Sequence, residues 1–256
     1  MKLYSKEELI EKLKEIQDME WLPNARHGNS GGVGNTLEDL LGIEENNLPI
    51  PNAAEWELKC QRIKTSSLTT LFHIEPSPRA VKFVPKILLP LYGWKHKNIA
   101  GEMSFRQTLN AATYTDRGFK INLDYKSRKI LVSFNKDMVS PRHSSWFNTV
   151  QKKVGLSELD PQPYWGFDDI HHIAATKLLN CFYVRADNKK EKKMEYFWFK
   201  EIFILQKFSI EGFLRALKEG VVFVDFDART GHNHGTKFRL KQGELPKLYK
   251  KITKVN

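Results

Sequence analysis

Segments with the spacing of an amphipathic helix alternate along this chain with segments that have the alternation of a strand, and this mixture limits the fold class most strongly. Ser5 and Glu8 form a capping box ahead of apolar residues at helical spacing, which predicts a helix over Lys6–Asp18. Residues 55–60 alternate between polar and apolar side chains, as a half-buried strand does. No segment repeats, so the sequence predicts a mixed α/β or α+β chain.

The remaining elements follow from the same patterns. Further helices are expected over 36–41, where Gly42 ends the helix, over 168–179 and over 208–218. Further strands are expected over 67–74, 119–124, 129–134, 181–185, 196–205 and 221–226. The glycine-rich segment 28–34 and the lysine-rich run 189–193 are expected to be loops.

The charge of the chain favours a polyanionic partner. The sequence has 41 basic and 30 acidic residues, a net charge of +11. Residues 1–50 carry 5 basic and 10 acidic side chains, 51–188 carry 20 and 12, and 189–256 carry 16 and 8. Contact with a polyanion is therefore expected to avoid the N-terminal helix.

Several classes of protein do not fit the sequence. No uncharged stretch approaches the roughly 18 to 20 apolar residues that cross a bilayer, and the N-terminal segment lacks the features of a secretion signal. Cys60 and Cys181 lie far apart with no CxxC pattern, so neither a disulfide scaffold nor a zinc cluster is indicated. We expect a protein of the reducing cytoplasm.

The strand at 55–60 carries the clearest chemical pattern. Alternation places Glu55, Glu57 and Lys59 on one face and the apolar residues between them on the other. Two carboxylates and an ammonium on one strand suit Mg²⁺ chemistry beside a phosphate. The alternative is an amphipathic surface strand, because a bare ExK motif is weak.

The segment upstream of this strand adds a second feature. Leu48-Pro49-Ile50-Pro51-Asn52 places Asn52 five residues before Glu57 and seven before Lys59, and this spacing resembles the PD-(D/E)xK nuclease core. The resemblance implies that Asn52, Glu57 and the Leu58 carbonyl hold Mg²⁺ and that Lys59 lies beside the attacking water. That family has Asp where this chain has Asn52. A neutral amide is a weaker ligand, so metal affinity and activity should fall, and the sequence leaves open whether the chain is a naturally impaired member or an inactivated variant.

More of the chain is similar to one branch of these nucleases. The segments 34–42, 44–48, 57–59 and 68–72 resemble the MutH-like restriction endonucleases of the MvaI and BcnI type. The resemblance implies that Glu38 lies beside the catalytic carboxylates. It also implies one domain over 1–256, with a mixed central sheet flanked by helices. Within it we expect a catalytic core over about 5–75 and 165–256, and an inserted DNA-clamping lobe over about 80–160.

A second motif lies near the C-terminus, in the segment Gly231-His232-Asn233-His234-Gly235-Thr236-Lys237-Phe238-Arg239. By itself His-x-His allows a metal pair, a cap or a loop, and a loop is the default because no third ligand is near. The segment resembles the base-reading segment of the same family, in which His and Arg side chains enter the major groove. The resemblance implies DNA contacts by residues of three segments, namely His73, His232, His234, Lys237, Arg239, Arg26 and His27.

The implied function is that of a Type II restriction endonuclease. The family resemblance implies Mg²⁺-dependent cleavage of double-stranded DNA at a short G·C-rich site of the CC-centre-GG kind. It also implies a monomer that cuts one strand at a time, in a bacterial or archaeal cytoplasm, without an obligate protein partner. A MutH-type repair nickase and a DNA-binding module with a decayed nuclease site are the alternatives. The recognition sequence, its central base pair and the cut position stay open.

Overall fold

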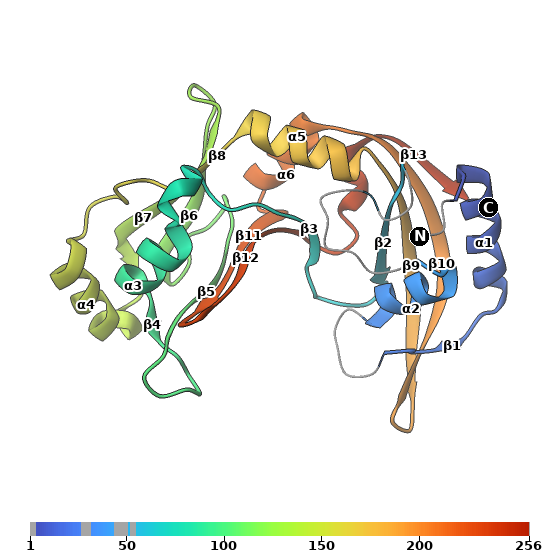
Figure 1. Ribbon diagram of the computed structural model, residues 1–256, viewed down its shortest axis with the longest axis horizontal. Coiled ribbons are helices and arrows are strands. Elements are labelled where there is room, and N and C mark those ends of the chain that lie inside the picture. Colours follow the sequence, from blue (N-terminus) through green and yellow to red (C-terminus); the bar gives the residue numbers. More distant parts are fainter. Residues whose placement is uncertain (1–3, 27–31, 44–50, 52–54, 256) are drawn as a thin grey trace. The chain divides into compact units, whose positions relative to one another are not determined.

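The computed structural model describes residues 4–26, 32–43, 51 and 55–255, and its chain divides into two compact units (Figure 1). Unit 1 comprises Met1–Thr69, His172–Gly212 and Lys241–Asn256. Unit 2 comprises Thr70–His171 and Phe213–Leu240. Each unit has its own sheet or sheets, and each is described by itself.

Unit 1 is built on a mixed sheet. Its strand order is β1–β10–β9–β2, and β13 also pairs with β10. The strands are β1 (Leu22–Pro23), β2 (Glu57–Arg62), β9 (Asn180–Glu191), β10 (Met194–Phe208) and β13 (Tyr249–Val255). β2 runs parallel to β9, whereas the other pairs are antiparallel. A parallel pair needs a long crossover, and in this chain the crossover contains the first segment of unit 2.

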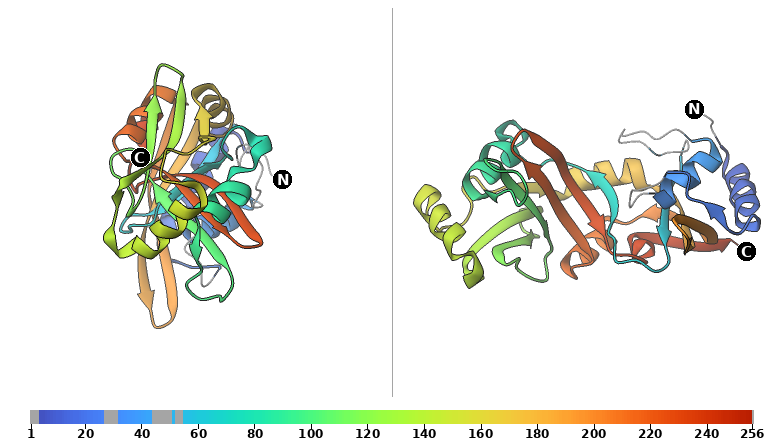
Figure 2. Two further views of the ribbon diagram at one scale, coloured as in Figure 1. Left: turned by 90° about the vertical axis from the view of Figure 1, so that its left-hand side faces the viewer. Right: turned by 90° about the horizontal axis from the view of Figure 1, so that it is seen from below.

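Two helices supply apolar side chains to the core of unit 1. These are α1 (Lys6–Asp18) and α2 (Gly32–Leu41). The predicted capping box is confirmed, because Ser5 Oγ accepts from the Glu8 amide and the Glu8 carboxylate accepts from the Ser5 amide. The core contains Leu9, Leu13, Ile16, Val33, Leu37, Leu41, Trp56, Leu58, Phe182 and Val184. Val255, at the end of β13, also packs against this core, and Figures 1 and 2 show that strand end beside α1.

Unit 2 contains two sheets. One has the order β3–β12–β11–β5–β4 and the other has the order β6–β7–β8. The strands are β3 (Thr69–His73), β4 (Trp94–Lys95), β5 (Met103–Leu109), β6 (Arg117–Asp124), β7 (Lys129–Val139), β8 (Tyr164–Gly166), β11 (Val222–Arg229) and β12 (His232–Leu240). The predicted hairpin of 119–124 and 129–134 is confirmed as β6 and β7, with Asp124 opposite Lys129.

The other helices are short or lie at the boundary between the units. α3 (Leu89–Tyr92) and α4 (Ser144–Val154) belong to unit 2, whereas α5 (Phe167–Leu178) and α6 (Ile210–Lys218) each cross the boundary. Single turns are η1 (Arg79–Val81), the π-turn η2 (Val84–Leu88), η3 (Pro141–His143) and η4 (Leu245–Leu248). None of the helices in the described ranges is both long and apolar enough to span a bilayer.

Aromatic rings fill the core of unit 2. The ring of Phe119 lies 5.2 to 6.4 Å, centroid to centroid, from the rings of Tyr92, Phe105, Phe134 and Trp146. Edge and tilted contacts of this kind add stabilisation beyond the buried area. The core therefore joins β5, β6, β7, α3 and α4.

Parts of two predicted loops are regular structure instead, while residues 28–31 of the first lie outside the described residues. Gly32 and Gly34 lie in α2, four residues or less before the expected helix start. A Cβ at position 32 would lie only 2.8 Å from the side-chain nitrogen Nδ2 of Asn24. Glycine there therefore permits a close approach between the helix and the preceding segment. In the run 189–193 the loop prediction is wrong for Lys189–Glu191, which continue β9 and pair with β10, whereas Lys192 and Lys193 form the turn between the two strands.

The C-terminal segment 231–239 is likewise a strand and not the default loop. His232–Leu240 form β12, which pairs with β11 along most of its length. Residues 213–240 belong to unit 2, and the expected division into a catalytic core and an inserted lobe stays a prediction. The expected inserted lobe of about 80–160 falls inside unit 2.

Gly118 offers a test of the packing of β6 against β7. It has a φ of +74° at a register shift between the two strands, and a Cβ there would lie 2.3 Å from the Asn135 carbonyl oxygen. We expect Gly118→Ala to lower the free energy of unfolding by roughly 3 kcal/mol or more, measured by urea denaturation. The matched control is Gly101→Ala, which has a φ of +80° and no atom within 4 Å. It should cost only about 1 kcal/mol, and equal losses for both variants would contradict the steric argument.

Candidate functional site

Strand β2 presents a buried acid and a nearby ammonium on one face. Glu57 has only 1% of its surface exposed, and its Oε1 accepts a hydrogen bond from Lys59 Nζ at 2.6 Å. The Leu58 side chain takes the opposite face and is buried in the core of unit 1. The predicted alternation is therefore confirmed for these three residues. Glu55 departs from it, because it lies in a turn before β2 and is exposed.

A second ammonium reaches the same carboxylate. Lys177 Nζ, on the part of α5 that belongs to unit 1, lies 4.0 Å from Glu57 Oε1. Its side chain is 18% exposed, and that of Lys59 is 16% exposed. The sequence predicted the helix but gave no signal that singled out Lys177. Its importance follows from the position of α5, which directly precedes β9, the parallel partner of β2.

The two lysines differ in their electrostatic balance. Burial alone would lower the pKa of Lys59, but the charge of Glu57 and its hydrogen bond outweigh burial, so the pKa of Lys59 is raised. Burial lowers the pKa of Lys177, and the neighbouring Lys59 ammonium lowers it further, against the attraction of Glu57. Lys59 is therefore a firmly held cation at neutral pH.

Glu38 belongs to the same electrostatic cluster. It is half-buried on α2, a helix that lies against β2. Its carboxylate contributes an attraction that raises the pKa of both Lys59 and Lys177. The fold thus brings together Glu38, Glu57 and Lys59, which the sequence placed in one site, and adds Lys177.

The oxygen donors of this cluster suit a hard cation. Carboxylate and carbonyl oxygens are the ligands that Mg²⁺ takes in proteins, and Glu57 and the Leu58 carbonyl provide both types on β2. The described residues contain no group of three or more His, Cys, Asp or Glu side chains arranged to hold a metal. Asn52, the third expected ligand, lies outside the described residues.

Gln61 continues the polar face of β2 and was not identified from the sequence. It is buried, and its Oε1 accepts a hydrogen bond from the Tyr183 hydroxyl at 2.6 Å. Its Nε2 donates to Thr69 Oγ1. Burial raises the pKa of Tyr183 to about 12, so the phenol remains a donor. The network fixes the end of β2 beyond Lys59.

Arg26 is held by an acid next to Glu38 in the sequence. Its Nη2 and Nε donate to the two carboxylate oxygens of Asp39 at 2.7 and 3.2 Å. Both side chains are partly exposed. This two-point pairing fixes the guanidinium at the start of the segment expected to contact DNA, whereas His27 lies outside the described residues.

In unit 2, β3 and β12 bring the predicted histidines together. The Ile74 amide, next to exposed His73, donates to the Thr236 carbonyl at 3.0 Å. A Cβ at Gly235 would lie 3.7 Å from His73 Cδ2, so the end of β3 lies beside the histidine segment. The rings of His232 and His234 stack at 6.4 Å with 15° between their planes, and both residues are exposed. Residues two apart on a strand share a face, which is why these rings stack.

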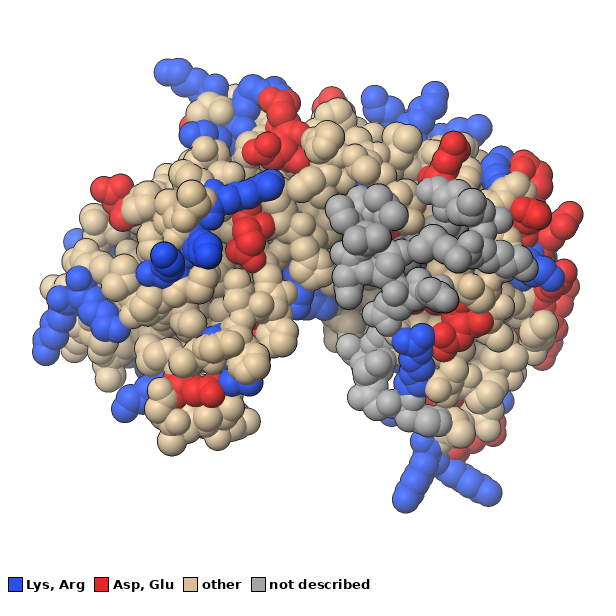
Figure 3. All heavy atoms as spheres, in the orientation of Figure 1, with Lys and Arg blue, Asp and Glu red and all other residues tan. Residues whose placement is uncertain are grey.

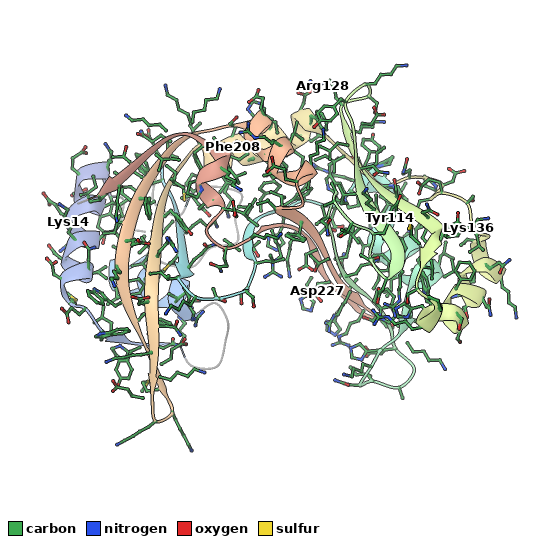
Figure 4. All side chains as sticks on the ribbon, turned by 180° about the vertical axis from the view of Figure 1, so that it is seen from behind. Lys14, Tyr114, Arg128, Lys136, Phe208 and Asp227 are labelled. Carbon is green, nitrogen blue, oxygen red and sulfur yellow. The ribbon has the colours of Figure 1, made fainter. Side chains whose placement is uncertain are left out.

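Lys237 and Arg239 lie further along β12 and pair with acids of β11. Arg239 Nη1 lies 3.1 Å from Asp225 Oδ2, and Lys237 Nζ lies 3.5 Å from Asp227 Oδ2. Arg106 of β5 also binds Asp227, at 2.8 Å (Figure 4, Asp227 labelled). The period-two pattern of 222–229 could have revealed these acids. Their carboxylates fix the directions of cations on one face of the sheet.

Comparison with known proteins gives one family and one fold. Residues 10–249 match the family model described as the MvaI/BcnI restriction endonuclease family. No curated protein matches the sequence. Among solved structures, the chain is similar to restriction endonuclease MvaI in complex with cognate DNA, with a TM-score of 0.78, 24% identity and coverage of 98% of this chain and 99% of that chain.

The chain is also similar to restriction endonuclease MvaI in the absence of DNA. Here the TM-score is 0.57, the identity is 24%, and both chains are covered in full. At this identity the likeness concerns the fold. It confirms the predicted fold class, a mixed α+β architecture with a nuclease-like core.

The buried charge cluster predicts a stability change. Glu57→Gln removes the negative partner of two partly buried ammonium groups, Lys59 and Lys177. We expect its free energy of unfolding to fall by roughly 1 to 3 kcal/mol, measured by urea denaturation. Glu15→Gln, at an exposed pair with Lys12, is the matched control and should change it by less than about 0.5 kcal/mol. A Glu57→Gln protein as stable as the unmodified one would show that Glu57 does not balance these charges.

Proposed function

The chain belongs to the MvaI/BcnI restriction endonuclease family, and from this premise we propose that it cleaves double-stranded DNA. The proposed target is a short G·C-rich site of the CC-centre-GG kind. The protein would act as a monomer that cuts one strand at a time. The observation that supports this most is the pairing of buried Glu57 with Lys59 beside Glu38. The solved MvaI complex contains cognate DNA, which agrees with duplex DNA as the substrate.

Mg²⁺ is the cofactor that the donor set suits. Glu57 and the Leu58 carbonyl would hold it, together with the amide oxygen of Asn52. Bound Mg²⁺ would supply positive charge at the scissile phosphate and lower the pKa of a bound water. The negative charge of Glu38 adds to the field that attracts a cation to this part of unit 1.

Lys59 has the role of a fixed cation in this proposal. Its ammonium is held 2.6 Å from Glu57 Oε1 and can donate further hydrogen bonds. An ammonium at this place can orient the attacking water and stabilise the negative charge that develops on the phosphate. Burial of Glu57 limits the movement of the pair and so fixes the direction of the ammonium.

The exposed face of β12 and the end of β3 are the proposed base-reading surface. His73, His232 and His234 can each donate or accept a hydrogen bond at a base edge, and Arg239 can bind guanine with two hydrogen bonds. Lys237 and Arg26, together with His27, complete the proposed DNA contacts. Asp225 supports the role of Arg239, since it holds the guanidinium in one direction.

Restoring the expected carboxylate tests the metal site. We expect Asn52→Asp to raise the rate of Mg²⁺-dependent plasmid linearisation about tenfold or more, because a charged ligand binds the cation more strongly than an amide. Asn98→Asp, at an exposed turn, adds the same charge elsewhere and should give no increase.

The products of that digest separate the alternatives. A nicked circle that persists without conversion to linear DNA would favour a repair nickase. Tight sequence-specific binding without cleavage, even by the Asn52→Asp protein, would favour a DNA-binding module with a decayed site. Rapid cutting by the sequence as it stands would contradict the role given to Asn52.

Arg239 gives a test of base reading. Arg239→Lys replaces a planar group that makes two hydrogen bonds with a point charge. We expect it to weaken discrimination at one base pair by about 1 to 3 kcal/mol, with little change in non-specific affinity. Competition binding in Ca²⁺ between the selected site and duplexes that differ at single positions measures this. Arg215→Lys, an exposed position on α6, is the control, and an equal loss at every position would argue against base reading by Arg239.

A further inference from the structure

The hairpin of β9 and β10 extends beyond the sheet of unit 1. Pairing between the two strands continues to Glu191 and Met194, whereas the pairing of β2 with β9 ends at Ala186. The two strands continue as a ribbon beyond the end of β2, which Figure 1 and the left view of Figure 2 both show. β1 pairs with β10 at Tyr196 and Phe197, and the Asn24 amide donates to the Glu195 carbonyl at 2.8 Å, so the described chain is two-stranded at the tip beyond these residues.

The end of this ribbon is strongly basic. Residues 189–193 contain four lysines and one glutamate, and the end of the hairpin shows as a group of Lys and Arg side chains in Figure 3. Lys190, Lys192 and Lys193 are exposed. Within the described part of the chain, neither Lys192 nor Lys193 forms an ion pair. These ammonium groups are therefore available to an anionic partner.

The turn at the tip has a lysine at a backbone position that lysine rarely adopts. Lys192 has a φ of +56° at the first position of a two-residue turn, where glycine, asparagine or aspartate is usual. A non-glycine residue in this region costs of the order of 1 kcal/mol. Lysine here adds charge at the expense of stability, which is what a binding role would favour.

Aromatic side chains hold the base of the tip in place. The Lys189 ammonium lies 4.6 Å above the Trp21 ring and 5.7 Å from the Tyr196 ring, and 2.8 Å from Glu191. Trp21 in turn packs at 5.9 Å against Trp198. These contacts restrict the ribbon, so less entropy is lost when its lysines bind.

The tip is far from the acid cluster of the same unit. Cys181 lies opposite Glu57 in the sheet, and Lys190 follows nine residues along β9. At about 3.3 Å per residue this is roughly 30 Å, the length of about nine base pairs of duplex. A tip at this distance would reach DNA outside a short recognition site.

We propose that the tip of the β9–β10 hairpin, formed by Lys190, Lys192 and Lys193, binds the phosphate backbone of duplex DNA that flanks the recognised site. This rests on the proposed function, because the partner is the same DNA that the nuclease site would cleave. The contact is independent of base sequence, since ammonium groups on an exposed ribbon neutralise phosphates without reading base edges.

The test compares two duplexes that share one site, selected by the protein from random DNA. One has 12 base pairs and the other 40. The variant carries Lys190→Gln, Lys192→Gln and Lys193→Gln, and the matched control carries Lys14→Gln, Lys250→Gln and Lys251→Gln, which are exposed lysines of the same unit. Affinity is measured in Ca²⁺ over a range of NaCl concentrations.

For the 40-base-pair duplex we expect the slope of log affinity against log salt concentration to be smaller in magnitude by about 1 to 3 in the hairpin variant. Its affinity near 0.15 M salt should be roughly tenfold lower. The 12-base-pair duplex and the control variant should show no such change. An unchanged slope on the long duplex, an equal loss on the short duplex or an equal loss in the control would overturn the inference. If the unmodified protein cleaves its site and the hairpin variant binds both duplexes with unchanged affinity, only this inference fails. If the unmodified protein binds neither duplex, the proposed function fails as well.

Discussion

The buried carboxylate of Glu57 is the constraint on which the candidate site depends. A charge removed from water must be compensated by fixed partners, and here the ammonium groups of Lys59 and Lys177 lie 2.6 and 4.0 Å from it. The parallel pairing of β2 with β9 sets this geometry, because it fixes the strand against the helix that carries Lys177. The proposed metal ligand and the cation beside it are thus part of the structural core of unit 1.

Paired charges also fix the cations of the proposed base-reading surface in unit 2. Asp225 and Asp227 hold Arg239, Lys237 and Arg106 in fixed directions before any DNA is present. Cations held in this way lose less freedom on binding than unpaired side chains would. The tip of the β9–β10 hairpin differs, because its lysines face solvent, which suits contact with backbone phosphates and not with base edges.

Local patterns predicted the elements whose partners lie nearby in the sequence. α1 was predicted with its capping box, the β6–β7 hairpin was predicted from its two segments, and the alternation of β2 correctly separated Glu57 and Lys59 from Leu58. Prediction failed where distant segments decide the structure. Residues 232–239 and 189–191 are strands because β11, β3 and β10 supply hydrogen-bonding partners, and polar or glycine-rich segments carry no local sign of such pairing.

The sequence by itself determined the family, because the family depends on short motifs. It also determined the mixed fold class and the face of β2 that carries Glu57 and Lys59, because these follow from the spacing of polar and apolar residues. Only the tertiary structure decided that Lys177 joins the cluster, that Asp225 and Asp227 hold Arg239 and Lys237, and that the lysine run forms the end of a ribbon. The physical reason is that electrostatic pairing depends on distance in space. Lys177 and Glu57, for example, lie 120 positions apart in the sequence, and no local pattern records such a pair.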